Sequence, residues 1–376
     1  MPSAGQLGFS MAPPARIIDI DQLDPAWLTA ALNAGSWPGR VDGTEVEVGD
    51  LVAEQIGAGV GITSLLYRVT PSYVGVAGPS TLVMKVPTDS PETRAVVDAF
   101  DFYAKECRFY TDLAAITPVA TPEVLYVDLD PDSSDFVLLM EDMSDVRMVD
   151  QIKGCTTEEA HSAMEALAGL HAHWWEPGAI DDIEWLPRPQ DPPYPQALEQ
   201  QIALSWPRVM AKHGDLVPPE VAAIGDRFAS RVPDLMRRLS QGPTTLVHGD
   251  YRLDNLLFPP EGVAPLTVID WQICMRGKAS YDTGYFLSQS LDPDQRGEIE
   301  HDLLRHYWQS LVAAGVEDYS YEQCWDDYRL GLLYCLVYPA SGEAVELVND
   351  RAIELFRTLL ERSCRAIVET GAIELL

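Results

Sequence analysis

The sequence predicts an α+β fold, with strand patterns concentrated in its first part and helix patterns in the remainder. Short runs rich in β-branched residues alternate with turns of Gly, Pro and Ser between residues 45 and 86. Helix start signals recur from Thr156 onward, where Thr156 and Glu159 have the spacing of a capping box. At 376 residues, with 47% hydrophobic content, the chain can bury a large core.

The first part is predicted to form an antiparallel sheet with one long helix. Residues 1–16 are expected to be disordered. Asp24 is expected to cap a helix through Leu32, and Ser90 a long helix through about Leu113. Antiparallel strands are predicted at residues 46–48, 51–56, 64–70, 81–86, 124–127 and 136–140.

The second part is predicted to be mainly helical. Helices are expected at residues 156–175, 195–213 and 219–239, and three amphipathic helices are expected between residues 294 and 376. Residues 177–195 are rich in proline and are predicted to be irregular, because helical patterns resume on both sides of them.

Two short apolar runs in the second part end in polar residues that carry the candidate chemistry. Asp250 follows an apolar pair, and Asn255 lies five residues later at the start of the run 256–258. Asp270 ends the run 266–269, which follows a Pro-Pro-Glu-Gly turn. The pattern predicts short buried strands joined by a hairpin, with polar side chains at their outer ends. These three side chains are therefore expected to converge.

The chemistry of this trio is complementary. Two carboxylates and an amide oxygen form a set of hard oxygen donors, which suits Mg²⁺ rather than zinc or copper. Phosphoryl transfer requires a carboxylate that orients the attacking hydroxyl, and an Asn and a second Asp that bind the metal. Kinase catalytic loops place the Asn five residues after the Asp, and Asp250 and Asn255 have that spacing.

This stretch resembles a known family. The string HGD-x4-N at 248–255, followed by VIDW at 268–271, resembles the aminoglycoside phosphotransferase and choline-kinase-like family of small-molecule kinases. The string HGDYRLDNLLF at 248–258 is also similar to the kinase-like domains that precede acyl-CoA dehydrogenases in fused enzymes, and to their free-standing bacterial relatives.

The resemblance implies a bilobal, protein-kinase-like fold. Residues 1–143 would form the nucleotide-binding lobe, and residues 144–376 a helical catalytic and substrate lobe. The segment at about 177–240 would be an insertion that helps to build the acceptor pocket.

The resemblance also implies a reaction and a role for each residue. ATP or GTP would donate a phosphoryl group, with Mg²⁺ as cofactor, to a hydroxyl of a small molecule. Asp250 would accept or orient the hydroxyl proton, with Arg252 near the transferred phosphate. Asn255 and Asp270 would bind Mg²⁺.

Two segments of the first part are candidates for nucleotide contacts. Gly57, Gly59 and Gly61 lie between two predicted strands and would fold over the phosphates, with an ordinary flexible turn as the alternative. Glu141 and Met143 lie where the interlobe hinge of the family reads the adenine edge through backbone groups. A plain exit from a strand is the alternative reading of that segment.

Lys85 lies within an apolar strand and needs a partner or a phosphate to offset its desolvation. Glu106, on the predicted long helix, is the expected partner, as in the lysine–glutamate pair of kinases. Glu92 and Asp101 are competitors for that position. Lys85 would then bind the inner phosphates of the nucleotide, positioned by Glu106.

The histidines of the second part are expected to be structural. His171 and His173 are two apart on a predicted helix and do not share a face, so core packing and capping are favoured over metal binding. His248 is expected to brace the catalytic loop rather than shuttle protons. Asp282, in a segment that resembles a turn of the family, is expected to make structural hydrogen bonds near that loop.

Composition restricts the partners and the compartment. A formal net charge of −32 argues against nucleic acids and anionic membranes. It suits either a cationic substrate or a solvated acidic surface. The six cysteines are scattered without a CxxC pair, which is typical of the reducing cytoplasm. No apolar run is long enough to cross a bilayer.

Two alternatives come from other functional classes. A nucleotide-binding pseudokinase or regulatory module would bind without turnover. A metal-dependent hydrolase would use His248 and Asp250 as ligands, but it would need further histidines at ligand spacing. Among kinases, the acceptor could be aminoglycoside-like, an amino-alcohol, a sugar or a hydroxyacyl compound. The sequence does not specify an oligomeric state.

Overall fold

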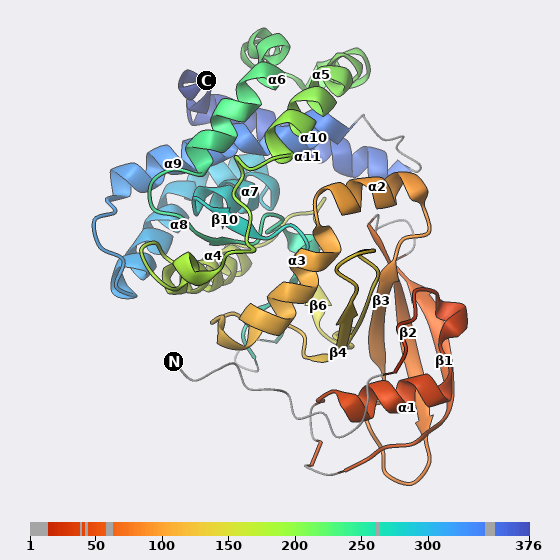
Figure 1. Cartoon of the computed structure of the whole chain (residues 1–376). Coiled ribbons are helices and arrows are strands. Elements are labelled where there is room, and N and C mark those ends of the chain that lie inside the picture. Colours follow the sequence, from red (N-terminus) through yellow and green to blue (C-terminus); the bar gives the residue numbers. More distant parts are fainter. Residues whose placement is uncertain (1–13, 38–39, 42–43, 58–62, 261–263, 343–349) are drawn as a thin grey trace. The chain divides into compact units, whose positions relative to one another are not determined.

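The computed structural model describes residues 14–37, 40–41, 44–57, 63–260, 264–342 and 350–376 (Figure 1). The chain forms two compact units, of which the first comprises residues 1–116 and 121–145 and the second residues 117–120 and 146–376. The division into a nucleotide-binding lobe ending at residue 143 and a catalytic lobe with an insertion at about 177–240 stays a prediction.

The first unit is built on a five-stranded antiparallel sheet with the order β1-β2-β3-β5-β4. Its strands are β1 (Val48–Ile56), β2 (Ser64–Tyr73), β3 (Leu82–Pro87), β4 (Val124–Leu129) and β5 (Phe136–Glu141). An irregularity in pairing between Val48 and Asp50 lets one strand continue where the sequence pattern predicts two. The predicted antiparallel sheet is confirmed.

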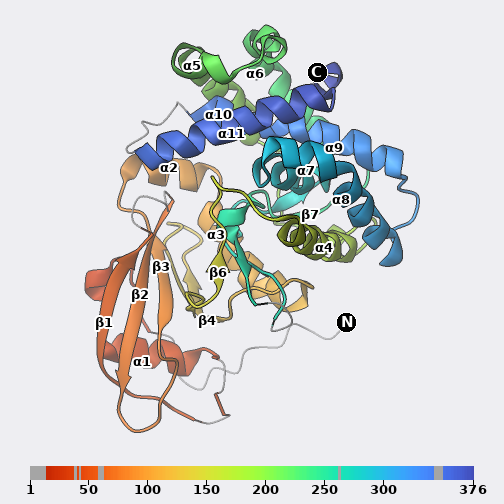
Figure 2. The same ribbon diagram turned by 180° about the vertical axis from the view of Figure 1, so that it is seen from behind.

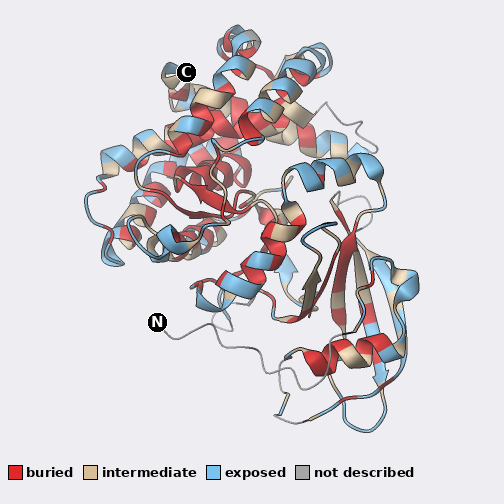
Figure 3. Cartoon of the chain, viewed as in Figure 1, coloured by how far each residue is buried: buried red, intermediate tan, exposed pale blue. Residues whose placement is uncertain are grey.

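The two faces of this sheet are covered by different helices. Alternate residues of β3 point to opposite faces. Met84 joins the apolar core that also contains Trp27 and Leu28 of α1 (Pro25–Ala34). Lys85 points the other way and pairs with Glu106 of α3 (Phe102–Arg108). Figure 3 shows that much of α1 and β3 is buried.

The predicted helix over residues 90–113 is interrupted. Ser90 caps α2 (Pro91–Ala99) as expected, but α3 begins only after Asp101. The backbone of Asp101 is left-handed, with φ 52°, and a right-handed helix cannot continue through it. A π-helical turn, η2 (Phe109–Leu113), and a 3-10 turn, η3 (Ala114–Ile116), follow α3.

Most of the segment predicted to be disordered, residues 1–13, lies outside the described residues. Arg16 belongs to the same predicted segment but is tied to the first unit. Its guanidinium forms ion pairs of 2.8 Å with both Asp128 and Asp130. The chain is therefore ordered at Arg16, because two carboxylates from the β4–β5 region hold it.

The second unit is mainly helical, as predicted. Its longer helices are α4 (Thr157–His173), α5 (Tyr194–His213), α6 (Pro219–Leu239), α7 (Ser280–Gln289), α8 (Pro293–Ala313), α9 (Tyr321–Cys335), α10 (Val337–Gly342) and α11 (Asp350–Glu369). The capping box of Thr156 and Glu159 is present at the start of α4. The final region contains four helices in its described part rather than the three expected.

Helix α7 was not predicted, because its sequence suggested only a turn. Every residue of α7 is buried, and Figure 2 shows it surrounded by α4, α8, α9 and α11. A helix that is enclosed on all sides has no polar face, so its sequence lacks the amphipathic period.

Short strands connect the helices around the predicted motif. The hairpin of β8 (Leu256–Phe258) and β9 (Thr267–Val268) confirms the predicted pair of buried strands. β6 (Arg147–Met148) extends this hairpin on its other side. β7 (Thr245–Val247) pairs instead with β10 (Met275–Gly277). Within the described parts of the chain, no helix is both long and apolar enough to cross a membrane.

Candidate active site

The loop that carries the predicted catalytic residues begins where β7 ends. Gly249 has a φ of +85°, and a Cβ atom there would lie 2.5 Å from the backbone oxygen of Ile273. Both the left-handed backbone and the close approach therefore require glycine. This turn directs the chain from the buried strand into the segment that contains Asp250.

A buried carboxylate holds this turn in place. Asp282, in the first turn of α7, is fully buried. Its Oδ2 accepts a hydrogen bond from the backbone N–H of His248 at 2.7 Å, and its Oδ1 accepts one from Gly249 at 2.8 Å. Hydrogen bonds to a charged acceptor are stronger than those between neutral groups. The structural hydrogen bonds expected of Asp282 are confirmed.

Two further buried side chains support Asp282. His171 Nε2 lies 3.2 Å from Asp282 Oδ2, and His171 Nδ1 lies 2.7 Å from the hydroxyl of Tyr307. His171 is thus a core histidine, as predicted, and not an isolated metal ligand. The participation of Tyr307 was missed, because it lies on α8, 136 residues from His171, and has no local sequence signal.

Asp250 is surrounded by hydrogen-bond donors. Arg252 Nε donates to Oδ1 at 3.1 Å, and Asn255 Nδ2 donates to Oδ2 at 2.8 Å. The buried hydroxyl of Tyr285 also hydrogen-bonds with this carboxylate. Burial, together with the charge of Asp250, raises the pKa of Tyr285 well above its usual value, so Tyr285 stays protonated as a donor. Tyr285 was not predicted as a site residue.

Arg252 remains a cation although its guanidinium is largely buried. Burial alone would lower its pKa, but the nearby carboxylates of Asp250 and Asp254 outweigh that effect and raise it. Arg252 forms ion pairs with both carboxylates. A permanent positive charge is thus fixed beside Asp250.

The β8–β9 hairpin brings the predicted metal ligands to one end of a ladder. Asn255 ends the 3-10 turn η6 (Leu253–Asn255) just before β8, and the N–H of Ile269 donates to its backbone oxygen at 3.0 Å. Asp270 follows directly, with a left-handed φ of +66°. Gln272 Nε2 donates to Asp270 Oδ2 at 3.2 Å. The non-glycine left-handed backbone is a strained feature of the kind found at functional sites.

The donor atoms fit a hard cation. Asn255 Nδ2 also donates to the backbone oxygen of Asp250 at 2.9 Å, which leaves its side-chain oxygen as the atom that could bind a metal. Among the residues described, no group of three or more His, Cys, Asp or Glu side chains is arranged to hold a metal ion. One carboxylate and one amide oxygen instead match the way Mg²⁺ is bound, with nucleotide phosphates and water completing its shell.

His248 is a structural brace, as expected. Its Nδ1 accepts a hydrogen bond from the N–H of Asp250 at 3.2 Å, and its Nε2 lies 2.9 Å from the carbonyl oxygen of Ile269. With Nδ1 as acceptor and Nε2 as donor, both ring nitrogens are used within the protein. This arrangement argues against the hydrolase alternative, which needs His248 as a metal ligand.

The first unit contains a second predicted cluster. Lys85 Nζ lies 2.8 Å from Glu106 Oε1 and 2.6 Å from Oε2, and both side chains are buried. The pairing predicted for these two residues is therefore present, in preference to Glu92 or Asp101. Their contact with nucleotide phosphates stays a prediction.

The other predicted nucleotide contacts lie at the ends of β1 and β5 or outside the described residues. Gly57 ends the β1 region with a left-handed φ of +66°, whereas Gly59 and Gly61 lie outside the described residues. Glu141 is the last residue of β5, and Met143 follows it in a loop where both are partly buried. Their hinge role stays a prediction.

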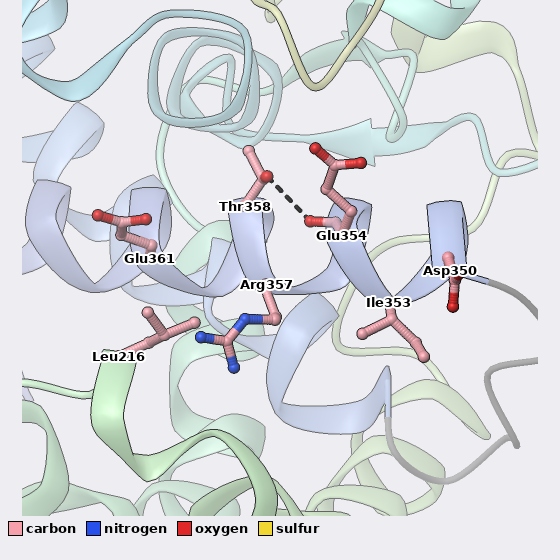
Figure 4. Close-up of a pocket in the computed structure, with 7 residues that line it drawn as sticks. All are labelled: Leu216, Asp350, Ile353, Glu354, Arg357, Thr358 and Glu361. Carbon is pink, nitrogen blue, oxygen red and sulfur yellow. Dashed lines mark hydrogen bonds between the residues drawn. The ribbon is translucent and has the colours of Figure 1, made fainter.

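A pocket on the second unit contains none of the predicted site residues. It has a volume of about 390 Å³ and is lined by residues of α11 and the turn before α6 (Figure 4): Leu216, Asp350, Ile353, Glu354, Arg357, Thr358 and Glu361. Arg357 is already paired with Asp215 at 2.9 Å. Three carboxylates in the lining make it a poor site for phosphates.

This chain is similar in sequence to part of some larger proteins. It is 26% identical over 179 residues to acyl-CoA dehydrogenase family member 10 of Mus musculus, which corresponds to 40% of this chain and 17% of the mouse protein. It is 29% identical over 76 residues to family member 11 of Homo sapiens, 20% of this chain and 9% of the human protein. The chain therefore spans less than a fifth of the length of these relatives.

Solved structures and a family model show the fold and the family of this chain. A Ralstonia eutropha protein assigned to the aminoglycoside phosphotransferases superposes with a TM-score of 0.53 and 17% identity, covering 88% of this chain and 94% of that one. Choline kinase from Cryptosporidium parvum gives 0.51 and 11%, covering 86% and 92%. These likenesses confirm the protein-kinase-like fold. Residues 67–316, more than half of the chain, match the phosphotransferase enzyme family, and the protein belongs to that family.

Proposed function

We propose that this protein transfers the γ-phosphoryl group of ATP or GTP to a hydroxyl of a small molecule, with Mg²⁺. The observation that carries the proposal is the geometry of Asp250. Its carboxylate is oriented by Arg252 and Asn255, and Asn255 is joined through Ile269 to the strand end that presents Asp270. A carboxylate beside an Asn and a second Asp is the arrangement that phosphoryl transfer uses.

Each residue has a role in this proposal. The carboxylate of Asp250 accepts the proton of the attacking hydroxyl, while Asn255 and Tyr285 hold it in one orientation. The fixed cation of Arg252 favours the negative charge of the transferred phosphoryl group. Asn255 and Asp270 hold Mg²⁺, which offsets phosphate charge when bound.

The Lys85–Glu106 pair supplies the nucleotide contact in this proposal. Burial of a lysine in a strand requires a compensating partner, and Glu106 provides it. Lys85 binds the inner phosphates, and Glu106 fixes the position of the ammonium group. Gly57, Gly59 and Gly61 cover the phosphates, and the backbone near Glu141 and Met143 contacts the base.

The acceptor is a hydroxyl compound from one of four classes: an aminoglycoside-like compound, an amino-alcohol, a sugar or a hydroxyacyl compound. The net charge of −32 supports cationic members of this set, and the kinship with acyl-CoA dehydrogenase family proteins supports hydroxyacyl compounds. The scattered, buried cysteines support action in the reducing cytoplasm.

Nucleotide binding is the first test of this function. Thermal unfolding would be measured with ATP and with GTP, each with and without Mg²⁺. We expect an increase in melting temperature that requires Mg²⁺, because a ligand that binds only the folded state stabilises it. A matched measurement on Asp270→Asn should show a reduced Mg²⁺-dependent increment. No shift with either nucleotide would refute the proposal.

Phosphoryl transfer is the second test. A labelled γ-phosphate would be followed onto compounds of the four acceptor classes, with Asp250→Asn as the inactive control. Transfer to one class by the native protein alone would identify the acceptor. Nucleotide binding without transfer to any hydroxyl compound would favour a pseudokinase or regulatory module instead.

A further inference from the structure

A short turn at residues 150–154, just before α4, contacts the catalytic loop through a hydrogen bond to Leu253. Asp150 builds this turn: its Oδ1 accepts hydrogen bonds from the N–H groups of Ile152 at 2.9 Å and Lys153 at 3.2 Å. The turn closes with the N–H of Gly154 donating to the Asp150 backbone oxygen at 3.1 Å. Gly154 has a φ of +79°, which favours glycine. The backbone of this turn is thus well defined.

The side chain of Gln151 projects from this turn into the interior. It is 1% exposed. Its Oε1 accepts a hydrogen bond from the backbone N–H of Leu253 at 2.8 Å, and its Nε2 donates to the backbone oxygen of Gln289 at 2.6 Å. The two ends of the amide have different partners, one donor and one acceptor. Only one orientation of the amide satisfies both.

The hydrogen bond to Leu253 reaches the candidate metal ligand. Leu253 begins the 3-10 turn that ends at Asn255, and the N–H of Asn255 donates to the backbone oxygen of Arg252 at 2.9 Å. The position of Leu253 therefore determines where this turn starts, and the turn determines where Asn255 lies. Asp282 holds the other end of the same loop through His248 and Gly249.

Arg362 of α11 holds Gln151 in place. Its Nη1 donates to the backbone oxygens of Gln151 at 2.8 Å and Gln289 at 2.6 Å, and its Nη2 donates to that of Ile152 at 2.8 Å. Arg362 is buried, and burial lowers its pKa below the usual value. A buried guanidinium whose N–H groups meet backbone oxygens with fixed geometry restrains the whole turn.

We propose that Gln151 is a positioning residue for Asn255, and that Arg362 acts through Gln151. This rests on the proposed function, in which Asn255 binds Mg²⁺. Loss of the Gln151 amide leaves the N–H of Leu253 buried without its acceptor, so the turn that ends at Asn255 shifts or opens. The consequence is weaker binding of Mg²⁺ in the presence of nucleotide.

Three substitutions in the full-length protein separate these contacts. Gln151→Met preserves the volume of the side chain and removes both hydrogen bonds. Gln151→Glu retains an acceptor for the N–H of Leu253 and removes the donor to Gln289. Arg362→Met removes the restraint on Gln151. Arg296→Met is the matched control, because Arg296 is also a buried arginine of this unit and pairs with Glu300 and Glu369.

Hydrogen–deuterium exchange of the peptide that contains Leu253 gives the first readout. We expect about tenfold faster exchange at the Leu253 amide in Gln151→Met and Arg362→Met, since an amide that loses a buried acceptor opens more readily. Gln151→Glu should retain most of the protection. Arg296→Met should leave the exchange rate of this peptide unchanged when the variants are compared at temperatures equally far below their melting temperatures. Equal exchange in all variants would overturn the proposal.

The Mg²⁺ dependence of ATP binding, measured by calorimetry, gives the second readout. We expect the Mg²⁺ concentration for half-maximal binding to rise about tenfold in Gln151→Met, with partial recovery in Gln151→Glu. An unchanged Mg²⁺ dependence, or an equal change in Arg296→Met, would overturn the proposal. If the native protein binds no nucleotide, the proposed function fails and so does the Mg²⁺ role. The exchange comparison would still decide whether Gln151 holds the turn.

Discussion

The carboxylate of Asp282 accepts a hydrogen bond from the backbone N–H of Gly249 at 2.8 Å. Gly249 has a backbone that favours glycine, and Asp282 comes from a helix whose residues are all buried. The loop that carries Asp250 is therefore held by a helix that is buried along its whole length. Interactions far from Asp250 in the sequence determine where its carboxylate lies.

This arrangement predicts the effect of Asp282→Asn. A carboxylate accepts bonds from His248, Gly249 and His171, whereas an amide has an NH₂ group that would face one of these donors. We expect a loss of about 2–4 kcal/mol in the free energy of unfolding, measured by urea denaturation. Turnover should fall about 100-fold or more, because the loop no longer holds Asp250.

Asp292→Asn is the control for that substitution. Asp292 caps α8 by accepting hydrogen bonds from Asp294 and Gln295, and Asn caps helices as well as Asp does. Its stability should change little. A stable, active Asp282→Asn variant would contradict the anchoring role.

Asp250→Asn is expected to abolish most turnover and leave nucleotide binding intact. The amide matches the shape of the carboxylate but cannot accept the hydroxyl proton. A general base contributes about 10²–10⁴-fold to rate, so turnover should fall by that factor. Calorimetry with ATP and Mg²⁺ measures the retained binding. Turnover at the native rate would remove Asp250 from its proposed role.

Asp270→Asn tests the proposed second metal ligand, and its control is a residue with the same left-handed backbone conformation. Asp318 is exposed and also left-handed, with φ 57° against 66° for Asp270. Asn tolerates this conformation as well as Asp does, so backbone strain is matched in the two variants. We expect Asp270→Asn to weaken Mg²⁺-dependent nucleotide binding, because an uncharged amide oxygen replaces a carboxylate, and Asp318→Asn to retain it. Equal binding in both would argue against a metal at Asp270.

Substitutions at the Lys85–Glu106 pair allow its effect on stability to be measured separately from its effect on nucleotide binding. Lys85→Met leaves Glu106 buried without its cation, which should cost about 3–5 kcal/mol of stability. The double variant Lys85→Met with Glu106→Leu should recover most of that loss, because two apolar side chains pack in place of the ion pair. Nucleotide affinity should stay low in both, because the ammonium group is absent. Full affinity in the double variant would show that Lys85 does not bind phosphate.

The buried thiols predict loss of stability at alkaline pH. Burial raises the pKa of Cys155, Cys324 and Cys364 to about 12, from an ordinary value of 9.0. Because these pKa values are raised in the folded protein, the protonated thiols contribute to the free energy of unfolding. This contribution is fully present below pH 9 and is lost as pH rises toward 12. Urea denaturation between pH 8 and pH 10, with reductant, should show this decline. Replacement of the three cysteines by alanine should make it shallower.

Local patterns in the sequence were sufficient for several elements. The capping box at Thr156 begins α4, and Ser90 caps α2. The β8–β9 hairpin lies where the apolar runs predict it. In each case the interacting residues are close in sequence, so the physical cause is visible in a short window.

Other features depend on contacts between distant residues. The break before α3 follows from the left-handed backbone of Asp101, which no local pattern indicates. The role of Gln151 requires Leu253, 102 residues away, and Arg362, 211 residues away. Burial erases the amphipathic signal of α7, so the helix that carries Asp282 was not recognised.

By itself the sequence predicted that Asp250, Asn255 and Asp270 are grouped by a local hairpin, and that hairpin forms where it was expected. It also predicted that Lys85 needs a partner, since an apolar strand cannot bury an ammonium group alone, and the structure shows that Glu106 is that partner. Only the tertiary structure decided which side chains hold the loop that carries Asp250. Asp282 and Gln151 meet this loop through hydrogen bonds, and His171 supports Asp282; these contacts exist only once the helices have packed.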